Sequence, residues 1–544
     1  MANALFNLPL PPNEPVRNYA PGSTERKSLK AKLTELKNQH IEIPLIIGGK
    51  EIKTGKLGSC VMPHQHQTEI GQYHQAGEKE VQLAVKASQK ARKQWAEMQW
   101  YDRVAIFMKA AELLAGPWRD TVNAATMLGQ SKNAFQAEID AAAELVDFFR
   151  FNCFYAMQIF EQQPAYSPAG IWNRMEYRPL EGFVFAVTPF NFTSIAGNLP
   201  SAPAIMGNVS LWKPASSAVY SAYYIMKIFQ EAGLPDGVIN FIPGSGSQVG
   251  NPVMASPDLA GIHFTGSTST FQGMWKTVGN TIQNYKWYPR IVGETGGKDF
   301  IVAHQSANLE ALGVALIRGA FEYQGQKCSA ASRAYIPKSL WPDLKEYLLK
   351  ELKTIKMGDV EDFSNFMNAV IDRAAFSTIT EYIDYIKKSD QAEIIFGGDY
   401  DDSTGFFIEP TVAVTKDPKF RTMQEEIFGP VLTLYIYDDN KYQETLHLCD
   451  ETSPYALTGA IFAQDRYAIE LADKILVNAA GNFYINDKPT GAVVGQQPFG
   501  GGRASGTNDK AGSLLNMIRW VTPRTIKENY VPPTNYRYPF MQEK

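Results

Sequence analysis

The sequence predicts an α/β protein with more than one domain, from three observations. From Gly182 onward, short apolar strands alternate with helical stretches, the pattern of a parallel sheet with crossover helices. Ahead of that region, apolar residues recur at helical spacing. The length of 544 residues is enough for two or three domains, each with a core of its own.

The composition excludes several classes of protein. Lys and Arg number 52 against 56 Asp and Glu, and no basic run stands out, so we expect no nucleic acid partner. The four cysteines lack CxxC spacing, which argues against a disulfide framework or zinc site and fits a reducing compartment. No run of about 18 apolar residues occurs, and the N-terminal residues resemble neither a signal peptide nor a presequence. We expect no membrane association and a soluble, intracellular protein, in a bacterial cytoplasm or, alternatively, in the mitochondrial matrix.

The first part of the chain is predicted to be an arm followed by helices. Residues 1–24 are rich in Pro and Asn, which favours an extended arm, and Ser23 or Thr24 is placed to cap the next helix. Apolar positions then recur at helical spacing in residues 78–95, 105–114 and 137–151.

Two segments far apart in the sequence are predicted to be edge or protruding strands. Residues 171–180 alternate weakly after proline breaks, and residues 519–528 near the end of the chain are similar. Together they could form a flap that bridges subunits.

The α/β part is predicted to have strands at residues 183–187, 209–212, 238–242 and 262–264, with a helix at 217–232. Gly244-Ser-Gly-Ser-Gln-Val-Gly250 follows the third strand. It departs from the GxGxxG spacing, so a dinucleotide site and a simple strand-to-helix turn are both open. In Phe264-Thr-Gly-Ser267, Gly266 and Ser267 precede a predicted helix whose N-terminal N–H groups could hold a pyrophosphate.

A single cysteine is the first candidate for chemistry. Cys328 lies in Gln324-Gly-Gln-Lys-Cys-Ser-Ala330, a turn between a predicted helix and a short strand. A thiol becomes a nucleophile as the thiolate, whose formation depends on the site. Without other evidence, an inert core cysteine is the commoner case. Cys60, Cys153 and Cys449 have no motif around them and are read as structural. His64 and His66 have a spacing usable by a metal, but an exposed loop is the favoured interpretation.

Six motifs in order resemble the aldehyde dehydrogenase superfamily, and the similarity extends from about residue 40 to the C-terminus. They are Thr188-Pro-Phe-Asn-Phe192, Leu211-Trp-Lys-Pro214, Phe264-Thr-Gly-Ser267, Gly293-Glu-Thr-Gly-Gly-Lys298, Gly325-Gln-Lys-Cys328 and Glu425-Glu-Ile-Phe-Gly-Pro430. Further segments resemble the branch that oxidises L-glutamate γ-semialdehyde to L-glutamate at the end of proline catabolism. They are residues 136–144, 148–152, 484–488, 495–501 and 505–509.

The resemblance implies three catalytic residues. Cys328 would add to the aldehyde carbonyl, and the amide of Asn191 would form an oxyanion hole beside the Cys328 backbone N–H. Glu294 would be the general base that activates water to hydrolyse the thioester. The alternatives are that Asn191 caps the next helix and that Glu294 is a solvated loop carboxylate.

The resemblance also implies a coenzyme site for NAD. The implied ligands are Thr188, Lys213, Ser216, Gly266, Ser267, Glu426 and Phe428. Lys213 would bind the adenosine ribose, Glu426 the nicotinamide ribose, and Phe428 would brace the nicotinamide. Many relatives have Glu where this chain has Ser216, so charge alone leaves NADP open.

The substrate's α-carboxylate would be held by Ser329 and the backbone N–H groups of Gly491 and Ala492. Phe192 and Phe499 would supply apolar walls. Glu144 would accept a hydrogen bond from the α-ammonium, or else be a surface helix carboxylate.

The predicted organisation has three parts. They are a Rossmann-like NAD-binding domain (1–164 and 185–295), an α/β catalytic domain (296–518) and a small β flap for oligomerisation (165–184 and 519–544), which implies a homodimer or higher homo-oligomer. Since residue 40 onward is taken up by this organisation, we expect a separate proline dehydrogenase upstream. Two alternatives remain: an aldehyde dehydrogenase for succinate or α-aminoadipate semialdehyde, and a non-catalytic protein that keeps the fold.

Overall fold

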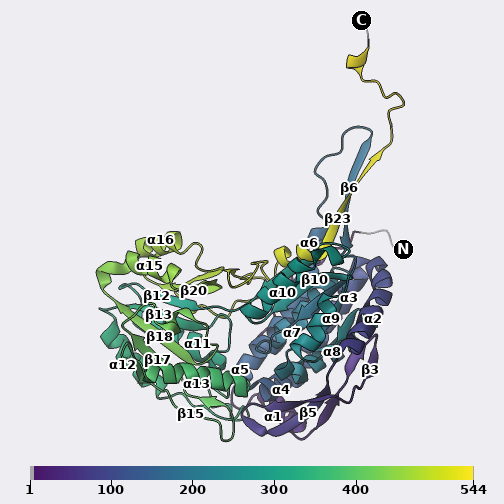
Figure 1. Ribbon diagram of the computed structural model, residues 1–544. Helices are drawn as coiled ribbons and strands as arrows, with labels where there is room; N and C mark the ends of the chain where they lie inside the picture. The colour runs from purple at the N-terminus through teal and green to yellow at the C-terminus, as the bar shows by residue number, and fades with distance from the viewer. Residues whose placement is uncertain (1–4, 543–544) are drawn as a thin grey trace.

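The computed structural model describes residues 5–542 and contains two large sheets side by side, with a narrow two-stranded ribbon projecting from one of them (Figure 1). Residues 1–4 of the predicted arm and 543–544 of the predicted flap lie outside the described residues. Within residues 5–542, none of the helices has the length and apolar character needed to span a membrane.

The first sheet has seven strands in the order β11-β10-β7-β8-β9-β2-β3. The five adjacent strands from β11 to β9 are parallel and largely buried on both faces, which explains their nearly continuous apolar sequences. Starting from β7, the chain adds β8 and β9 on one side and β10 and β11 on the other, so a ligand crevice is expected at the carboxyl edge. The strands are β2 (Leu45–Ile47), β3 (Lys50–Ile52), β7 (Phe183–Val187), β8 (Val209–Lys213), β9 (Ile239–Phe241), β10 (Leu259–Thr265) and β11 (Arg290–Glu294).

Helices cover this sheet, and those predicted at 78–95, 105–114 and 217–232 are confirmed. The helix predicted at 137–151 is more complex, because a π-helix, Glu138–Glu144, lies between α5 (Ala134–Ala137) and α6 (Leu145–Phe160). A local widening of the helix does not change which residues are apolar, so periodicity could not reveal it. The other helices are α2 (Glu78–Glu97), α3 (Trp100–Ala115), α4 (Arg119–Gln130), α7 (Thr193–Ile205), α8 (Val219–Ala232), α9 (Gly246–Met254) and α10 (Thr268–Asn280).

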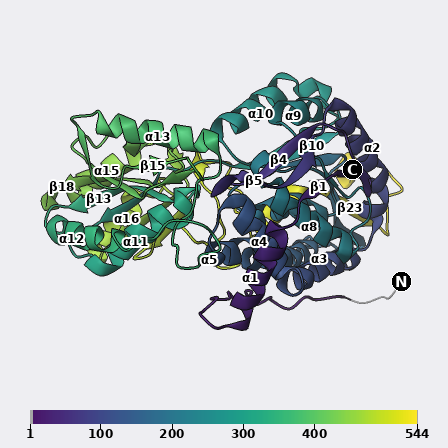
Figure 2. The same ribbon diagram turned by 90° about the horizontal axis from the view of Figure 1, so that it is seen from below.

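The N-terminal region begins with the predicted arm, since residues 5–23 contain no helix or strand. In Figure 2 the arm is the dark purple trace that leads from the grey N-terminal residues to α1 (Thr24–Lys37). Ser23 caps α1, as predicted, by accepting a hydrogen bond from the Arg26 N–H. A three-stranded sheet follows, formed by β1 (Ile41–Ile43), β4 (Leu57–Met62) and β5 (Gln65–His74).

The prediction that His64 lies in an exposed loop is wrong. His64 lies in the turn between β4 and β5. His64 is buried and hydrogen bonded to the Ser131 hydroxyl, and the His66 ring stacks on Phe406 of the second half of the chain. The turn therefore packs between the two halves of the molecule, a long-range contact that the sequence spacing gave no means to foresee.

The second sheet also has seven strands, in the order β14-β17-β18-β13-β12-β20-β21. They are β12 (Asp299–Ala303), β13 (Ala331–Pro337), β14 (Ala392–Phe396), β17 (Thr411–Thr415), β18 (Val431–Tyr437), β20 (Thr458–Phe462) and β21 (Asn482–Ile485). Helices α11 (Leu309–Phe321), α12 (Trp341–Leu352), α13 (Arg373–Lys387), α15 (Tyr442–Glu451) and α16 (Arg466–Ile475) accompany it. The smaller elements are β15 (Tyr400–Asp401), β16 (Phe407–Ile408), β19 (Tyr455–Ala456), β22 (Gly502–Arg503), α14 (Arg421–Gln424) and α17 (Leu514–Met517).

The ribbon consists of the two predicted protruding strands. β6 (Ile171–Pro179) pairs with β23 (Val521–Asn529) in antiparallel register, with Ile171 opposite Asn529 and Pro179 opposite Val521. The ribbon and the tail after it extend away from the rest of the chain (Figure 1). The two large sheets fall on either side of residue 295, although the exact domain limits stay a prediction.

Candidate active site

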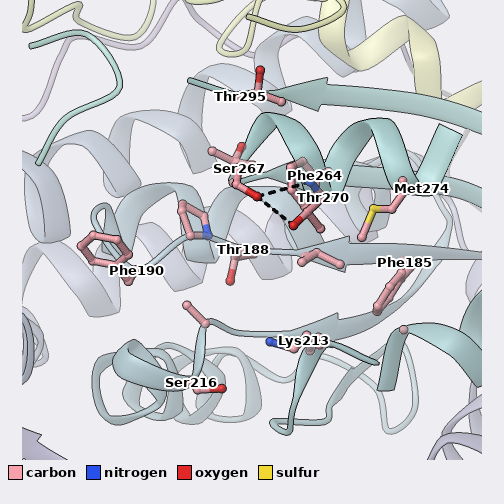
Figure 3. A pocket seen from close by; sticks show the side chains of 18 of the residues that line it. Phe185, Thr188, Phe190, Lys213, Ser216, Phe264, Ser267, Thr270, Met274 and Thr295 are labelled. Carbon is pink, nitrogen blue, oxygen red and sulfur yellow. Dashed lines mark hydrogen bonds between the residues drawn. The ribbon is translucent and has the colours of Figure 1, made fainter. Parts of the chain in front are cut away.

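A cavity of about 780 Å³ lies at the carboxyl edge of the first sheet. Segments that end or follow each parallel strand line it. They contribute Thr188, Lys213, Ser267 and Thr295 (Figure 3), and also Gly246. The predicted coenzyme ligands Ser216, Gly266, Glu426 and Phe428 also line it. The structure thus gathers all seven predicted coenzyme residues around one cavity, which we call the coenzyme cavity.

Two helices begin at this cavity. Ser267 caps α10 by accepting a hydrogen bond from the Thr270 N–H at 3.3 Å, and its hydroxyl also bonds the Thr270 hydroxyl (Figure 3). Ser245 caps α9, and Gly246 and Gly250 line the cavity. The glycine segment 244–250 is therefore a tight strand-to-helix turn that also forms part of the cavity wall. Helix N-termini favour negatively charged groups such as a pyrophosphate.

Polar groups in the cavity suit the hydroxyls of a ribose. Lys213 is buried, its ammonium donates to the Pro214 carbonyl at 3.0 Å, and burial lowers its pKa to about 8. The Glu426 carboxylate accepts a hydrogen bond from the Gly297 N–H at 2.9 Å, and burial raises its pKa to about 7. Phe428 packs edge-on against Phe190 at 5.7 Å between ring centres. The donors, acceptors and apolar walls present here fit a dinucleotide.

A strained loop presents Cys328. Tyr323 and Gln324 have positive φ angles of 51° and 55°, an uncommon conformation for residues other than glycine. The Gln324 amide donates to the carbonyls of Ser131 and Ala369, which ties the loop to both halves of the chain. Cys328 follows, just before β13, as predicted.

Cys328 is the only described residue that lines both the coenzyme cavity and a second cavity of about 500 Å³. The second cavity, here called the substrate cavity, is lined by all six predicted substrate residues, namely Glu144, Phe192, Ser329, Gly491, Ala492 and Phe499. The sulfur-bearing residue thus stands where the two cavities meet.

Burial, and then the negative charge of Glu294, raises the pKa of the Cys328 thiol well above its ordinary value. The thiol is therefore neutral at rest in this structure, and a proton must leave before it can attack a carbonyl.

Asn191 is buried at the coenzyme cavity near the cysteine loop, where its amide donates to the Gln326 carbonyl at 3.1 Å. The alternative that it caps the next helix is wrong. Asp140 performs that role for α7, by accepting hydrogen bonds from the N–H groups of Thr193 and Ser194 at 3.1 Å each. The Asn191 side chain is therefore free to interact with the loop that carries Cys328.

Glu294 is the last residue of β11 rather than a solvated loop carboxylate. It lines a small adjoining cavity of about 50 Å³, which shares Glu144 and Phe499 with the substrate cavity. Its Oε1 is buried and has no hydrogen-bond partner among the described residues. Burial raises the pKa of this carboxyl to about 8, against an opposing effect of Lys510.

The substrate cavity holds the groups predicted for an amino acid. The Ser329 hydroxyl hydrogen bonds that of Thr490 at 2.8 Å, and Gly491 follows with a φ of 97°, a conformation suited to glycine. Glu144 is no surface carboxylate, because it lines the cavity, accepts from the Ser194 hydroxyl at 2.6 Å and has its pKa raised by burial to about 8.

Two groups of cavity residues were missed by the sequence reasoning. Arg318, Lys327 and Lys488 bring cationic groups to the wall, and Lys327 pairs with Glu322 at 3.1 Å. Lys327 precedes Cys328 directly and Lys488 ends the segment 484–488 that carries part of the resemblance, so both had a signal in the sequence, whereas Arg318 had no motif. Asn13, Glu14 and Val16 come from the N-terminal arm, where no pattern pointed to a site.

The comparisons with known proteins agree with each other. The model of the aldehyde dehydrogenase family matches residues 53–522. The "Delta-1-pyrroline-5-carboxylate dehydrogenase, mitochondrial" of Dictyostelium discoideum is 56% identical over 540 residues, covering 99% of this chain and 97% of that protein. The human protein of the same name is 48% identical over 531 residues, covering 97% of this chain and 94% of its own. The crystal structure of the Delta-pyrroline-5-carboxylate dehydrogenase from Mycobacterium tuberculosis bound with NAD is 50% identical, with a TM-score of 0.96 and full coverage of both chains.

Proposed function

Since the chain belongs to the aldehyde dehydrogenase family, we propose that it oxidises L-glutamate γ-semialdehyde to L-glutamate with NAD, the second step of proline catabolism. The observation that carries this proposal is the position of Cys328 between a dinucleotide-sized cavity and a cavity suited to an amino acid. The high identity to the Δ1-pyrroline-5-carboxylate dehydrogenases supports the choice of substrate. The semialdehyde forms when pyrroline-5-carboxylate opens by hydrolysis.

Cys328 is the proposed nucleophile. After its proton has passed to solvent water, the sulfur forms a bond to the aldehyde carbon, and the carbonyl π electrons move to oxygen, giving a tetrahedral thiohemiacetal anion. The Asn191 amide and the Cys328 backbone N–H would stabilise this oxygen. Removing one such donor typically costs about 2.7–4 kcal/mol of barrier.

The hydride that leaves the thiohemiacetal carbon would be accepted by NAD when it is bound. Lys213, Ser216 and Glu426 would hold the two riboses, and the N-terminus of α10 with Gly266 and Ser267 would face the pyrophosphate. Thr188 and Phe428 complete the wall beside the cysteine. The chemistry of these groups fits NAD, which the related structure from M. tuberculosis contains.

Glu294 is the proposed general base for the second half of the reaction. Its carboxylate takes a proton from water, and the resulting hydroxide adds to the thioester carbon. The carbon–sulfur bond then breaks, so that the product is a free carboxylate and the thiolate is restored. A carboxyl whose pKa is close to the working pH suits this role, because it can both accept and release the proton.

The substrate's head group would be fixed at the far end of the substrate cavity. Ser329 and the backbone N–H groups of Gly491 and Ala492 would bind the α-carboxylate, and Glu144 would accept from the α-ammonium. Phe192 and Phe499 line the space between and suit the methylene groups. Phe192 is fixed by Lys132, whose buried ammonium lies 4.4 Å from its ring centre.

Assays with pyrroline-5-carboxylate and NAD⁺ test this function. We expect a clear preference for this substrate over succinate semialdehyde, α-aminoadipate semialdehyde and simple aldehydes, and for NAD⁺ over NADP⁺. Turnover of only the other aldehydes would refute the substrate assignment and leave the cysteine mechanism intact. A Cys328→Ala variant that still produces NADH would refute the mechanism.

We further propose a homodimer in which the ribbon of β6 and β23 adds to a sheet of the partner. Large apolar side chains on the ribbon and tail, among them Trp172 and Tyr530, are exposed in the single chain and support this. The buried cysteines fit a reducing compartment, a bacterial cytoplasm or a mitochondrial matrix, and several relatives are named as mitochondrial. A separate proline dehydrogenase would supply the substrate.

A further inference from the structure

The N-terminal arm forms part of the substrate cavity although it lies outside the residues matched by the aldehyde dehydrogenase family model. That model begins at residue 53, whereas Asn13, Glu14 and Val16 line the cavity. The general reaction of the family therefore does not account for these residues.

Asn13 joins two walls of the cavity that are far apart in the sequence. Its amide donates to the Asp147 carboxylate on α6 at 2.7 Å and to the Val494 carbonyl at 2.8 Å, and its own oxygen accepts from the Gln496 side chain at 2.9 Å. Val494 and Gln496 belong to residues 490–497, which we call the anchor loop. This loop carries Gly491 and Ala492, the proposed ligands of the α-carboxylate.

The rest of the arm is fixed firmly enough to act as a support. The Glu14 backbone N–H donates to Asp147 at 2.7 Å, and its carboxylate pairs with Arg119 at 2.5 Å and Arg150 at 2.8 Å. Further along, the Tyr19 hydroxyl donates to the Glu138 carboxylate. Pro11, Pro12 and Pro15 restrict the backbone before folding, which lowers the entropy lost when the arm is ordered.

The anchor loop needs such a support. Gly491 and Gly495 both have positive φ angles, of 97° and 82°, so the loop follows a path that few residues adopt. It contains no helix or strand, and besides Asn13 it is held by the Ser329–Thr490 hydrogen bond and by Val494, which packs in the core. The three hydrogen bonds of Asn13 connect it to α6, which packs in the core of the first half of the chain.

We propose that Asn13 is a positioning residue for the substrate's α-amino acid head group, because it fixes the anchor loop against α6. The inference rests on the proposed function, in which Gly491 and Ala492 bind the α-carboxylate. Asn13 itself takes no part in the chemistry at Cys328. Its loss should therefore weaken binding of aldehydes that carry the head group and leave aldehydes without it unaffected.

The test compares Asn13→Ala with Asn18→Ala, a control on the same arm whose exposed side chain accepts a hydrogen bond from the nearby Ala20 N–H. Steady-state kinetics are measured at saturating NAD⁺ with pyrroline-5-carboxylate and with butanal, which lacks the head group. We expect Asn13→Ala to raise KM for pyrroline-5-carboxylate about tenfold, the effect of losing one or two hydrogen bonds, with kcat changed less than about twofold. Butanal kinetics should stay at the wild-type values, and Asn18→Ala should match the wild type with both substrates.

Two further variants guard against a simple loss of folding. Gln496→Ala removes one of the same hydrogen bonds from the loop side and should raise the same KM by a smaller factor. Asn13→Asp keeps the shape of the side chain but places a second carboxylate beside Asp147, so it should raise KM more than Asn13→Ala does.

The outcomes separate this inference from the proposed function. An unchanged KM for pyrroline-5-carboxylate in Asn13→Ala, or equal losses with both substrates, would overturn the inference while the function stands. A wild-type enzyme with no preference for pyrroline-5-carboxylate over butanal would overturn the proposed function, and the role of Asn13 with it.

Discussion

Replacing Glu294 by Gln should separate the two halves of the reaction. The variant keeps the size of the side chain and removes the base, so Cys328 can still form the thioester but water is no longer activated. Loss of a general base typically lowers a rate about 10²–10⁴-fold, and we expect steady-state turnover to fall within that range. The first NADH formed at each active site should still appear rapidly.

The pKa of Glu294 also predicts the pH dependence of the wild-type enzyme. Burial raises this pKa to about 8, and the proposed base acts as the carboxylate, so activity should rise with pH as the group ionises. About one tenth of the enzyme carries the carboxylate at pH 7 and about nine tenths at pH 9. Turnover limited by hydrolysis should therefore increase about tenfold across this interval.

Rapid-mixing measurements of NADH absorbance provide the assay for both predictions. Glu294→Gln should give a burst of about one NADH per active site followed by a slow phase, and mass spectrometry should find the acyl group on Cys328. Glu451→Gln, at the exposed end of α15, is the control and should behave as the wild type. Full steady-state turnover by Glu294→Gln, or a burst lost together with turnover, would refute its role as the base of the hydrolysis.

Three other substitutions test further parts of the site. Asn191→Ala should lower kcat for pyrroline-5-carboxylate about 10²–10³-fold with little change in KM, since the Asn191 amide would act on the developing oxyanion. An unchanged kcat would show that Asn191 is not part of the oxyanion hole. Ser216→Glu should abolish any activity with NADP⁺, because a carboxylate beside the adenosine ribose repels a 2′-phosphate. Activity with NAD⁺ should persist. Equal losses with the two coenzymes would argue against the assignment of Ser216 to the ribose. Gly495→Ala should lower the free energy of unfolding by more than about 1 kcal/mol in chemical denaturation. The reason is that Gly495 has a φ of 82° and that an added Cβ would lie 2.3 Å from the Phe151 ring. Wild-type stability would mean that the anchor loop rearranges freely.

Much of the fold, and which residues line the two cavities, could be predicted from the sequence because the signals are local. The buried parallel strands are continuous apolar runs, and the turn that carries Cys328 is marked by its neighbours. The residues that line the coenzyme cavity follow strand ends, and parallel strands bring those ends to one edge whatever lies between them.

What the sequence could not reveal depends on contacts between distant segments. Asn13 and Val494 are separated by 481 positions, and neither belongs to a periodic pattern. Glu144 could not be told from a surface carboxylate, because its place in the cavity depends on the π-helix and on Ser194. His64 is buried where the turn that carries it packs against the other half of the chain.

The position of Cys328 between the two cavities has a kinetic consequence. Cys328 lies between the coenzyme cavity and the substrate cavity. Apart from Cys328, these two chambers are lined by different described residues. We therefore expect a molecule in one chamber to leave the other free for binding. Inhibitors that mimic the amino acid should therefore be non-competitive toward the coenzyme, and dinucleotide fragments should be non-competitive toward the aldehyde, so that ligands for the two chambers can be developed independently.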